Sequence, residues 1–188
     1  MKKIGITGSI ASGKSSASKF LSSGKGPLFN ADKVVKNLYL KQSFKKVISK
    51  KFKITNSKKI KSDLKKKILS DRTNIKKLEK IIHPIVRKEM KRFVKKNKKK
   101  QFIFFEIPLL IESKLMNNFD IIFFIKAKKN IRLKRFKSNG GSQEIFNLLN
   151  NKQLKDNKKI KYCDHVIVNE KNLKFLKEKL LSIFKQYE

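Results

Sequence analysis

Short apolar runs alternate along the chain with segments in which apolar residues recur every three or four positions. A short run bounded by turn residues is typical of a buried strand, whereas the longer spacing is typical of an amphipathic helix. Strands are therefore predicted at residues 2–7, 27–32, 101–110, 119–125 and 164–168. Helices are predicted at residues 14–23, 34–40, 130–137 and 143–154, and in a C-terminal stripe formed by Leu173, Leu176, Leu180, Ile183 and Phe184.

A long segment, residues 43–97, keeps the helical period throughout. Ser62 or Asp63 is expected to cap a helix that starts at Leu64, and Pro84 is expected to interrupt the next helix or to open another. The lysine-rich residues 95–100 are expected to form a loop.

Strands that alternate with helices predict an α/β fold with a doubly wound, five-stranded parallel sheet flanked by helices. The expected core comprises residues 1–34, 100–130 and 160–188, and the helical residues from about 35 to 99 form an insert.

The large positive charge of the chain does not by itself indicate nucleic-acid binding. The 188 residues carry a formal net charge of +36, but only five of the 50 basic residues are arginine, the side chain best suited to reading nucleic acid. The lysines are spread along the whole chain, which favours a solvated surface and predicts no specific nucleic-acid partner.

One cysteine, Cys163, excludes an internal disulfide, and no apolar run is long enough to span a bilayer. With no signal-peptide pattern at Met1, a cytoplasmic location without membrane attachment is expected.

The strongest motif follows the first predicted strand. The sequence "GSIASGKS", residues 8–15, matches G-x-x-x-x-G-K-[ST] at every fixed position. In such a loop the backbone N–H groups surround a β-phosphate, the lysine bridges the β- and γ-phosphates, and the final hydroxyl is a ligand of Mg²⁺. The motif predicts a nucleoside triphosphate site, and its candidate residues are Gly8, Ala11, Ser12, Gly13, Lys14, Ser15 and Ser16.

Other features narrow the class of triphosphate-binding protein. A regulatory GTPase needs N-K-x-D, and the nearest match, "NKQL" at residues 151–154, lacks the aspartate. A motor-type ATPase needs a strand that ends in aspartate, whereas the third predicted strand carries Glu106. A small-molecule kinase needs a carboxylate near the γ-phosphate, an acceptor pocket and a cationic lid. Candidates for these parts are present.

Asp32 is the candidate carboxylate, because it is expected at the end of the second strand, on the same edge of the sheet as the phosphate loop. Its alternative role is to cap a helix that begins at Lys33. Glu106 is a candidate to hold a water bound to Mg²⁺, or else to cap a turn. Lys134, Arg135 and Arg132 are the lid candidates, unless they are ordinary cations of an exposed helix.

Several segments together resemble the dephospho-CoA kinases. They are "IGITGSIASGKSSASKFL", "LFNADKVVKNL", "LEKIIHPIVRKEM", "EIPLLIESKL" and "CDHVIVNE", which follow one another in that family's order from Lys3 to about Glu170. The pair His83-Pro84 combined with Pro108-Leu109-Leu110 is the most specific part of the resemblance.

The resemblance implies ATP-dependent phosphorylation of the ribose 3′-hydroxyl of dephospho-CoA, which gives CoA and ADP. It implies that Asp32 is the catalytic base, that Lys14 and Arg135 act on the phosphates, and that Ser15 binds Mg²⁺. It also implies an acceptor-binding insert and a helical lid at about residues 131–159. The implied acceptor-binding residues are Asp32, His83, Pro108, Leu109 and Leu110.

Some positions depart from the family pattern. Asn30 stands where the family has an acidic residue, and Asn139 and Leu149 stand where it usually has arginines. Lys137, Lys152 and Lys159 are candidates to replace these arginines as point charges.

Three questions stay open from the sequence. Taken alone, His83 favours a capping or packing role over a catalytic one. A nucleotide or nucleoside kinase of similar architecture is the alternative function, and a nucleic-acid-binding ATPase is a weaker one. The chain is expected to be a monomer or a small homo-oligomer.

Overall fold

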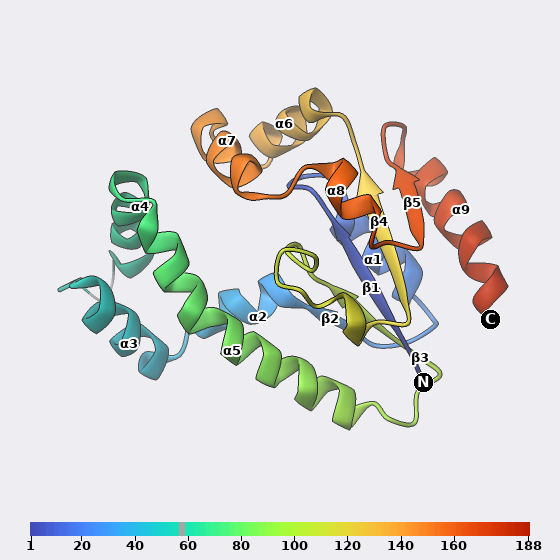
Figure 1. Cartoon of the computed structure of the whole chain (residues 1–188), viewed down its shortest axis with the longest axis horizontal. Coiled ribbons are helices and arrows are strands. Elements are labelled where there is room, and N and C mark those ends of the chain that lie inside the picture. The colour runs from blue at the N-terminus through green and yellow to red at the C-terminus, as the bar shows by residue number, and fades with distance from the viewer. Residues whose placement is uncertain (57–58) are drawn as a thin grey trace. The chain divides into compact units, whose positions relative to one another are not determined.

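Five strands of the chain form one parallel sheet (Figure 1). The computed structural model describes residues 1–56 and 59–188. The strand order is β2-β3-β1-β4-β5, and all four pairings are parallel, so the predicted fold class is confirmed. The strands are β1 (Lys2–Gly8), β2 (Leu28–Asn30), β3 (Phe102–Glu106), β4 (Ile121–Lys126) and β5 (His165–Val168).

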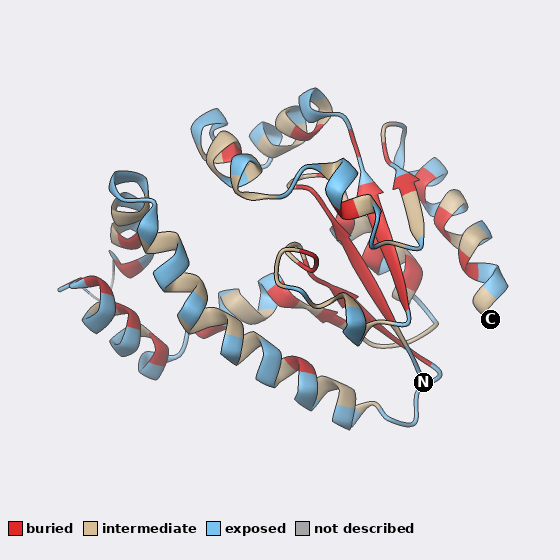
Figure 2. Ribbon diagram, in the orientation of Figure 1, coloured by how far each residue is buried: buried red, intermediate tan, exposed pale blue. Residues whose placement is uncertain are grey.

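Burial on both faces explains why the central strands read as continuous apolar runs. Every residue of β3 is buried, and β4 is buried as far as Ile125 (Figure 2). Ile4 and Ile6 of β1 are completely buried, and they belong to a core cluster that also contains Phe104 and Phe123. The apolar stripe of the C-terminal helix contributes Leu176, Leu180 and Phe184 to the same cluster.

The chain divides into two compact units, residues 1–30 with 97–188 and residues 31–96. The first unit contains the sheet and the 3₁₀ turns Met116–Asn118 and Lys185–Tyr187. Its helices are α1 (Lys14–Ser22), α6 (Lys129–Ser138), α7 (Gln143–Lys152), α8 (Asp156–Ile160) and α9 (Leu173–Phe184). α8 was not predicted from the sequence, because five residues are too few to show a helical period.

The second unit is helical over most of its described residues. Its helices are α2 (Ala31–Leu38), α3 (Gln42–Phe52), α4 (Ile60–Ser70) and α5 (Thr73–Lys96). It has a core of its own, formed by Leu38, Phe44, Ile48, Phe52, Ile54, Ile60 and Leu64. No helix among residues 1–56 and 59–188 combines the length and the apolar character needed to cross a membrane.

The predicted position of Asp32 at a strand end is wrong. β2 ends at Asn30, and Asp32 lies in the first turn of α2. Because this helix begins at Ala31, the alternative of a cap before Lys33 is wrong as well. An aspartate is favoured in a first turn by the positive end of the helix, which explains the early start.

Two predictions about the long helical segment also fail. α4 begins at Ile60, so Ser62 and Asp63 lie inside it instead of capping it. Ile60 and Leu64 are both buried on one side of α4, and burying Ile60 extends the helix towards its N-terminus.

Pro84 neither ends α5 nor begins another helix, because it lies inside one continuous helix of 24 residues. His83, which precedes it, is therefore an interior residue of the helix and not a cap. The missing N–H of a proline weakens a helix locally. Here Ile81 and Ile82 before the proline and Ile85 after it pack on the same core, which keeps the helix together.

Candidate functional site

The phosphate loop, residues 8–15, connects β1 to α1 and depends on glycine at two positions. Gly8 has φ +148°, and a Cβ there would lie 2.3 Å from the carbonyl oxygen of Ile125. Gly13 has φ +97°, and its Cβ would lie 2.1 Å from Nδ2 of Asn169. Ala11 adopts φ +57° although it is not a glycine. The motif's glycines are therefore required by both torsion and space.

The N-terminus of α1 has the properties of an anion site. Its N-cap is Gly13, no side chain caps it, and its first turn contains no acidic residue. The Lys14 ammonium donates a hydrogen bond to the Ser9 carbonyl oxygen over 2.9 Å. The Ser12 hydroxyl is buried and lacks a hydrogen-bond partner among the described residues. A buried hydroxyl without a partner is costly, and a phosphate oxygen would satisfy it.

Glu106 lies beside the loop at the end of β3, and it is only 3% exposed. Its Oε1 accepts a hydrogen bond from the Ser15 hydroxyl at 2.5 Å. Its Oε2 accepts one from the Ser18 hydroxyl at 2.9 Å and one from the Asn30 amide at 2.5 Å. The structure thus brings two predicted residues, Ser15 and Glu106, into direct contact. Ser18 was missed, although its spacing of three from Ser15 places both on one side of α1.

The first half of the loop is held by side chains from α6 to α8. The Ser9 hydroxyl donates to Asp156 Oδ1 at 2.5 Å. The Ile10 N–H donates to Gln153 Oε1 at 2.8 Å, and the Ile10 carbonyl accepts from Arg132 NH1 at 3.3 Å. Burial lowers the pKa of the Arg132 guanidinium, and the nearby Asp156 carboxylate opposes this shift. Arg132, at 6% exposure, is therefore buried structure and not an exposed lid cation.

The second half of the loop is held by Asn169, which follows β5. Its Nδ2 donates to the Ser12 carbonyl at 2.9 Å, and its own carbonyl accepts from Arg135 NH1 at 3.1 Å. Asn169 was missed as a site residue. Its position just after a parallel strand is the signal that could have found it, because carboxyl ends of such strands line ligand sites.

A buried ion pair lies next to the loop. The Lys159 ammonium is 3.0 Å from Glu112 Oε1 and 3.5 Å from the Ser9 hydroxyl, and its side chain is completely buried. Glu112 Oε1 also accepts from the Leu154 N–H at 3.1 Å, while Glu112 Oε2 lacks a hydrogen-bond partner in the part of the chain that the structure describes. Lys159 is thus engaged by Glu112, and the Lys137 ammonium donates to the Gln143 side chain at 2.8 Å.

The remaining predicted residues have different surroundings. Leu110 is completely buried and would meet a Cβ on Gly5, so it is a core residue of the sheet unit. The Pro108 carbonyl accepts a hydrogen bond from the Thr7 hydroxyl at 3.3 Å. Asp32 and His83 belong to the second unit, on α2 and α5.

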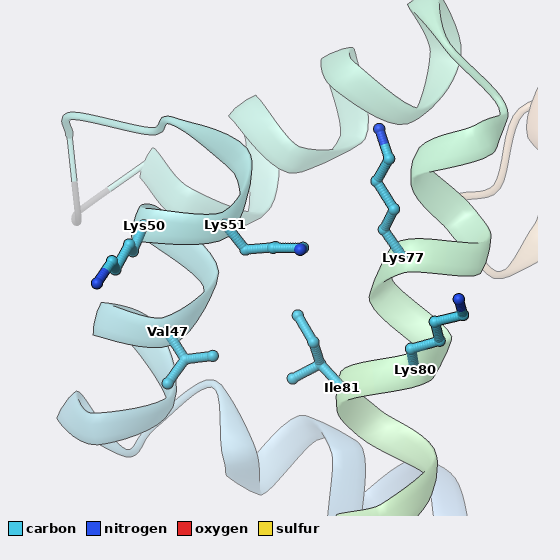
Figure 3. Close-up of a pocket in the computed structure, with 6 residues that line it drawn as sticks. All are labelled: Val47, Lys50, Lys51, Lys77, Lys80 and Ile81. Carbon is cyan, nitrogen blue, oxygen red and sulfur yellow. The ribbon is translucent and has the colours of Figure 1, made fainter.

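The second unit has a basic groove between α3 and α5, with a volume of about 620 Å³ (Figure 3). Val47 and Ile81 face each other across it, and Lys51 extends from α3 towards α5. Such a volume is typical of small-molecule sites. The residues that line the basic groove are Val47, Lys50, Lys51, Lys77, Lys80 and Ile81.

Comparison with known sequences gives matches over almost the whole chain. The sequence profile of the dephospho-CoA kinases matches residues 2–174. A dephospho-CoA kinase from Bartonella henselae is 32% identical over 190 residues, which cover 98% of this chain and 97% of the relative.

Two solved structures share the fold. One, from Thermus thermophilus, has a TM-score of 0.81 at 24% identity and covers 98% of this chain and 97% of its own. The other, a dephospho-CoA kinase from Campylobacter jejuni, has a TM-score of 0.65 at 22% identity and covers 100% of this chain and 97% of its own. With a family profile that spans nearly its whole length, the chain belongs to the dephospho-CoA kinase family.

Proposed function

We propose that Lys14, Asp32 and Arg135 carry out the transfer of the ATP γ-phosphoryl group to the ribose 3′-hydroxyl of dephospho-CoA. Family membership makes the chain a phosphotransferase of the last step of CoA biosynthesis, with ATP as the phosphoryl donor. One observation supports the site assignment above the others. The phosphate loop presents a helix N-terminus, a lysine and the unpartnered Ser12 hydroxyl beside the contact of Ser15 with Glu106.

The loop residues would bind the triphosphate as follows. The N–H groups at the start of α1 would donate to the β-phosphate, and the Ser12 hydroxyl would gain the acceptor that it lacks among the described residues. Lys14 would exchange the Ser9 carbonyl for β- and γ-phosphate oxygens. The exchange replaces a neutral acceptor by a charged one, so it favours binding.

The contact of Ser15 with Glu106 fits Mg²⁺. Hydroxyl and carboxylate oxygens are the ligands that Mg²⁺ prefers, and it usually takes only one or two from the protein and the rest from phosphates and water. We propose that Ser15 binds the ion and that Glu106 holds one of its waters. The ion, when bound, neutralises charge on the phosphates during transfer.

Asp32 is the proposed base. It would accept the proton of the 3′-hydroxyl as the oxygen attacks the γ-phosphorus, a task that a carboxylate within hydrogen-bond reach can perform. Arg135 would stabilise charge on the transferred group. Among the described residues its guanidinium makes one hydrogen bond, from NH1 to Asn169, which leaves further N–H groups for a phosphate.

We propose that the second unit binds the acceptor, with His83, Pro108 and Leu109 as further contacts. Dephospho-CoA contains a diphosphate and an extended, partly apolar arm. In the basic groove, the lysines would bind the diphosphate, and the apolar pair Val47 and Ile81 would contact the extended arm.

If the groove binds the acceptor, changing both Lys51 and Lys80 to glutamate raises KM for dephospho-CoA and leaves KM for ATP unchanged. Equal rises in both constants would remove the groove from the acceptor site.

Coupled measurement of ADP release tests the function. ADP formation should depend on dephospho-CoA and should fall at least about a hundredfold in Lys14→Met and Asp32→Asn, because each change removes a charge that acts in the transfer. Lys174→Met and Asp71→Asn are matched controls at exposed positions and should keep wild-type rates. Stimulation by a nucleoside monophosphate in place of dephospho-CoA would transfer the assignment to a nucleotide kinase.

We further propose that the protein acts in the cytoplasm as a monomer or small homo-oligomer, without a specific nucleic-acid partner. The single cysteine supports a reducing compartment. The charge alone predicts weak DNA binding that disappears with salt, and ATP turnover that DNA does not stimulate. DNA-stimulated turnover at physiological salt would favour the alternative of a nucleic-acid-dependent ATPase.

A further inference from the structure

Both backbone polar groups of Ile10, in the middle of the phosphate loop, are bound by side chains from distant parts of the chain. Gln153 accepts from the N–H at 2.8 Å, and Arg132 donates to the carbonyl at 3.3 Å. Within a triphosphate-binding loop, the backbone groups are the elements that must point in fixed directions. A side chain that binds these backbone groups therefore controls the loop conformation to which the phosphates bind.

Arg132 is firmly anchored on its own side. It is 6% exposed, its Nε donates to the Ala127 carbonyl at 3.1 Å, and NH1 also donates to Asn150 Oδ1 at 3.0 Å. The guanidinium lies 5.6 Å from the centre of the Phe146 ring. The two hydrogen-bond acceptors and the ring are neutral, and the nearby Asp156 carboxylate adds an electrostatic attraction without a direct hydrogen bond.

The torsions of the next residue explain why the Ile10 carbonyl needs such support. The plane of the Ile10–Ala11 peptide depends on φ of Ala11, which is +57°. Residues with a Cβ avoid this left-handed region, and only the surrounding structure can maintain it. The hydrogen bond from Arg132 to the Ile10 carbonyl opposes rotation of this peptide towards an ordinary torsion.

We propose that Arg132 and Gln153 are positioning residues for nucleotide binding: together they hold Ile10 so that the phosphate loop keeps its binding conformation before the triphosphate arrives. Preorganisation of this kind lowers the cost of binding, because the loop does not have to be ordered by the ligand. The inference rests on the assignment of residues 8–15 to the triphosphate.

Calorimetric titration with ADP and ATP tests the proposal in Arg132→Met and Gln153→Met. Each change removes one hydrogen bond to Ile10, and we expect nucleotide affinity to fall about tenfold, the equivalent of one such bond. Gln153→Met alters no charge, so a loss there cannot come from weaker electrostatic attraction. KM for dephospho-CoA should stay within about twofold of wild type in both variants.

Asn150→Ala is the matched control. It removes a partner of Arg132 that does not touch the loop, so it should lower thermal stability and leave nucleotide affinity unchanged. Because the two positioning residues act on one residue, the double variant should lose less affinity than the sum of the single losses. If Arg132→Met does not fold, Gln153→Met still decides the question.

Wild-type affinity in folded Gln153→Met would overturn the proposal, and so would an affinity loss in Asn150→Ala as large as that in Arg132→Met. These outcomes differ from failure of the proposed function, in which the wild-type protein itself would not bind ADP or ATP.

Discussion

Replacing Gly13 by alanine tests the architecture of the phosphate loop most directly. Two effects add at this position. Alanine at φ +97° is strained by about 1–2 kcal/mol. Its Cβ would also lie 2.1 Å from Nδ2 of Asn169, far inside contact distance, so that the Asn169 side chain must move.

The movement has a cost of its own. Asn169 is 3% exposed and donates to the Ser12 carbonyl at 2.9 Å, so breaking this bond costs about 0.5–1.5 kcal/mol, or up to about 3 if the amide stays buried and unpaired. The free energy of unfolding should therefore fall by about 1.5–3.5 kcal/mol in Gly13→Ala, or by up to about 5 kcal/mol if the amide stays unpaired. For a protein of this size, that lowers Tm by roughly 3–20 °C.

Thermal and urea unfolding followed by circular dichroism measure the change, and the chain offers a matched control. Gly24 has φ +72° and no atom within 4 Å of its Cβ position, so Gly24→Ala carries the backbone strain alone. Removing the clash in the double variant with Asn169→Ala should recover about 1–2 kcal/mol relative to the sum of the single changes. Equal losses in Gly13→Ala and Gly24→Ala, together with an additive double variant, would refute the reasoning.

Three further predictions concern groups beside the site. Burial raises the pKa of the Cys163 thiol to about 12. The contribution of this thiol to the free energy of unfolding is therefore complete below the ordinary thiol pKa of about 9, and it is lost as pH rises towards the pKa in the folded protein. A thiol reagent at pH 8 should react far more slowly with the native protein than with the protein unfolded in urea. Lys159→Met should lower the free energy of urea unfolding by about 3–5 kcal/mol, because it leaves Glu112 charged and buried. Adding Glu112→Leu should recover most of this loss. If the double variant recovers nothing, the loss does not come from the broken ion pair. Ser18→Ala should cost about 1.5–3 kcal/mol, because it removes a hydrogen bond to the Glu106 carboxylate, and a loss below about 0.5 would show that water replaces the hydroxyl.

Much of the fold could be predicted because the buried strands and the phosphate loop each depend on residues that are close together in the sequence. The buried residues of β3 and β4 form apolar runs in the sequence, and the glycine motif predicts a phosphate loop between β1 and α1. Capping and breaking signals were less reliable. Pro84 lies inside α5, because burial of the isoleucines on both sides of it outweighs one missing hydrogen bond.

The sequence by itself determined the parallel sheet and the phosphate loop, since each depends on residue types at short spacings, and the order of several motifs along the chain indicated the family. Only the tertiary structure decided which side chains support that loop. Arg132 and Gln153 meet at Ile10 across more than a hundred residues, and Asn169 reaches Ser12 from the far end of the chain. Such contacts between residues distant in sequence depend on the order of the strands in the sheet, and hydrophobic periodicity along the chain does not predict that order.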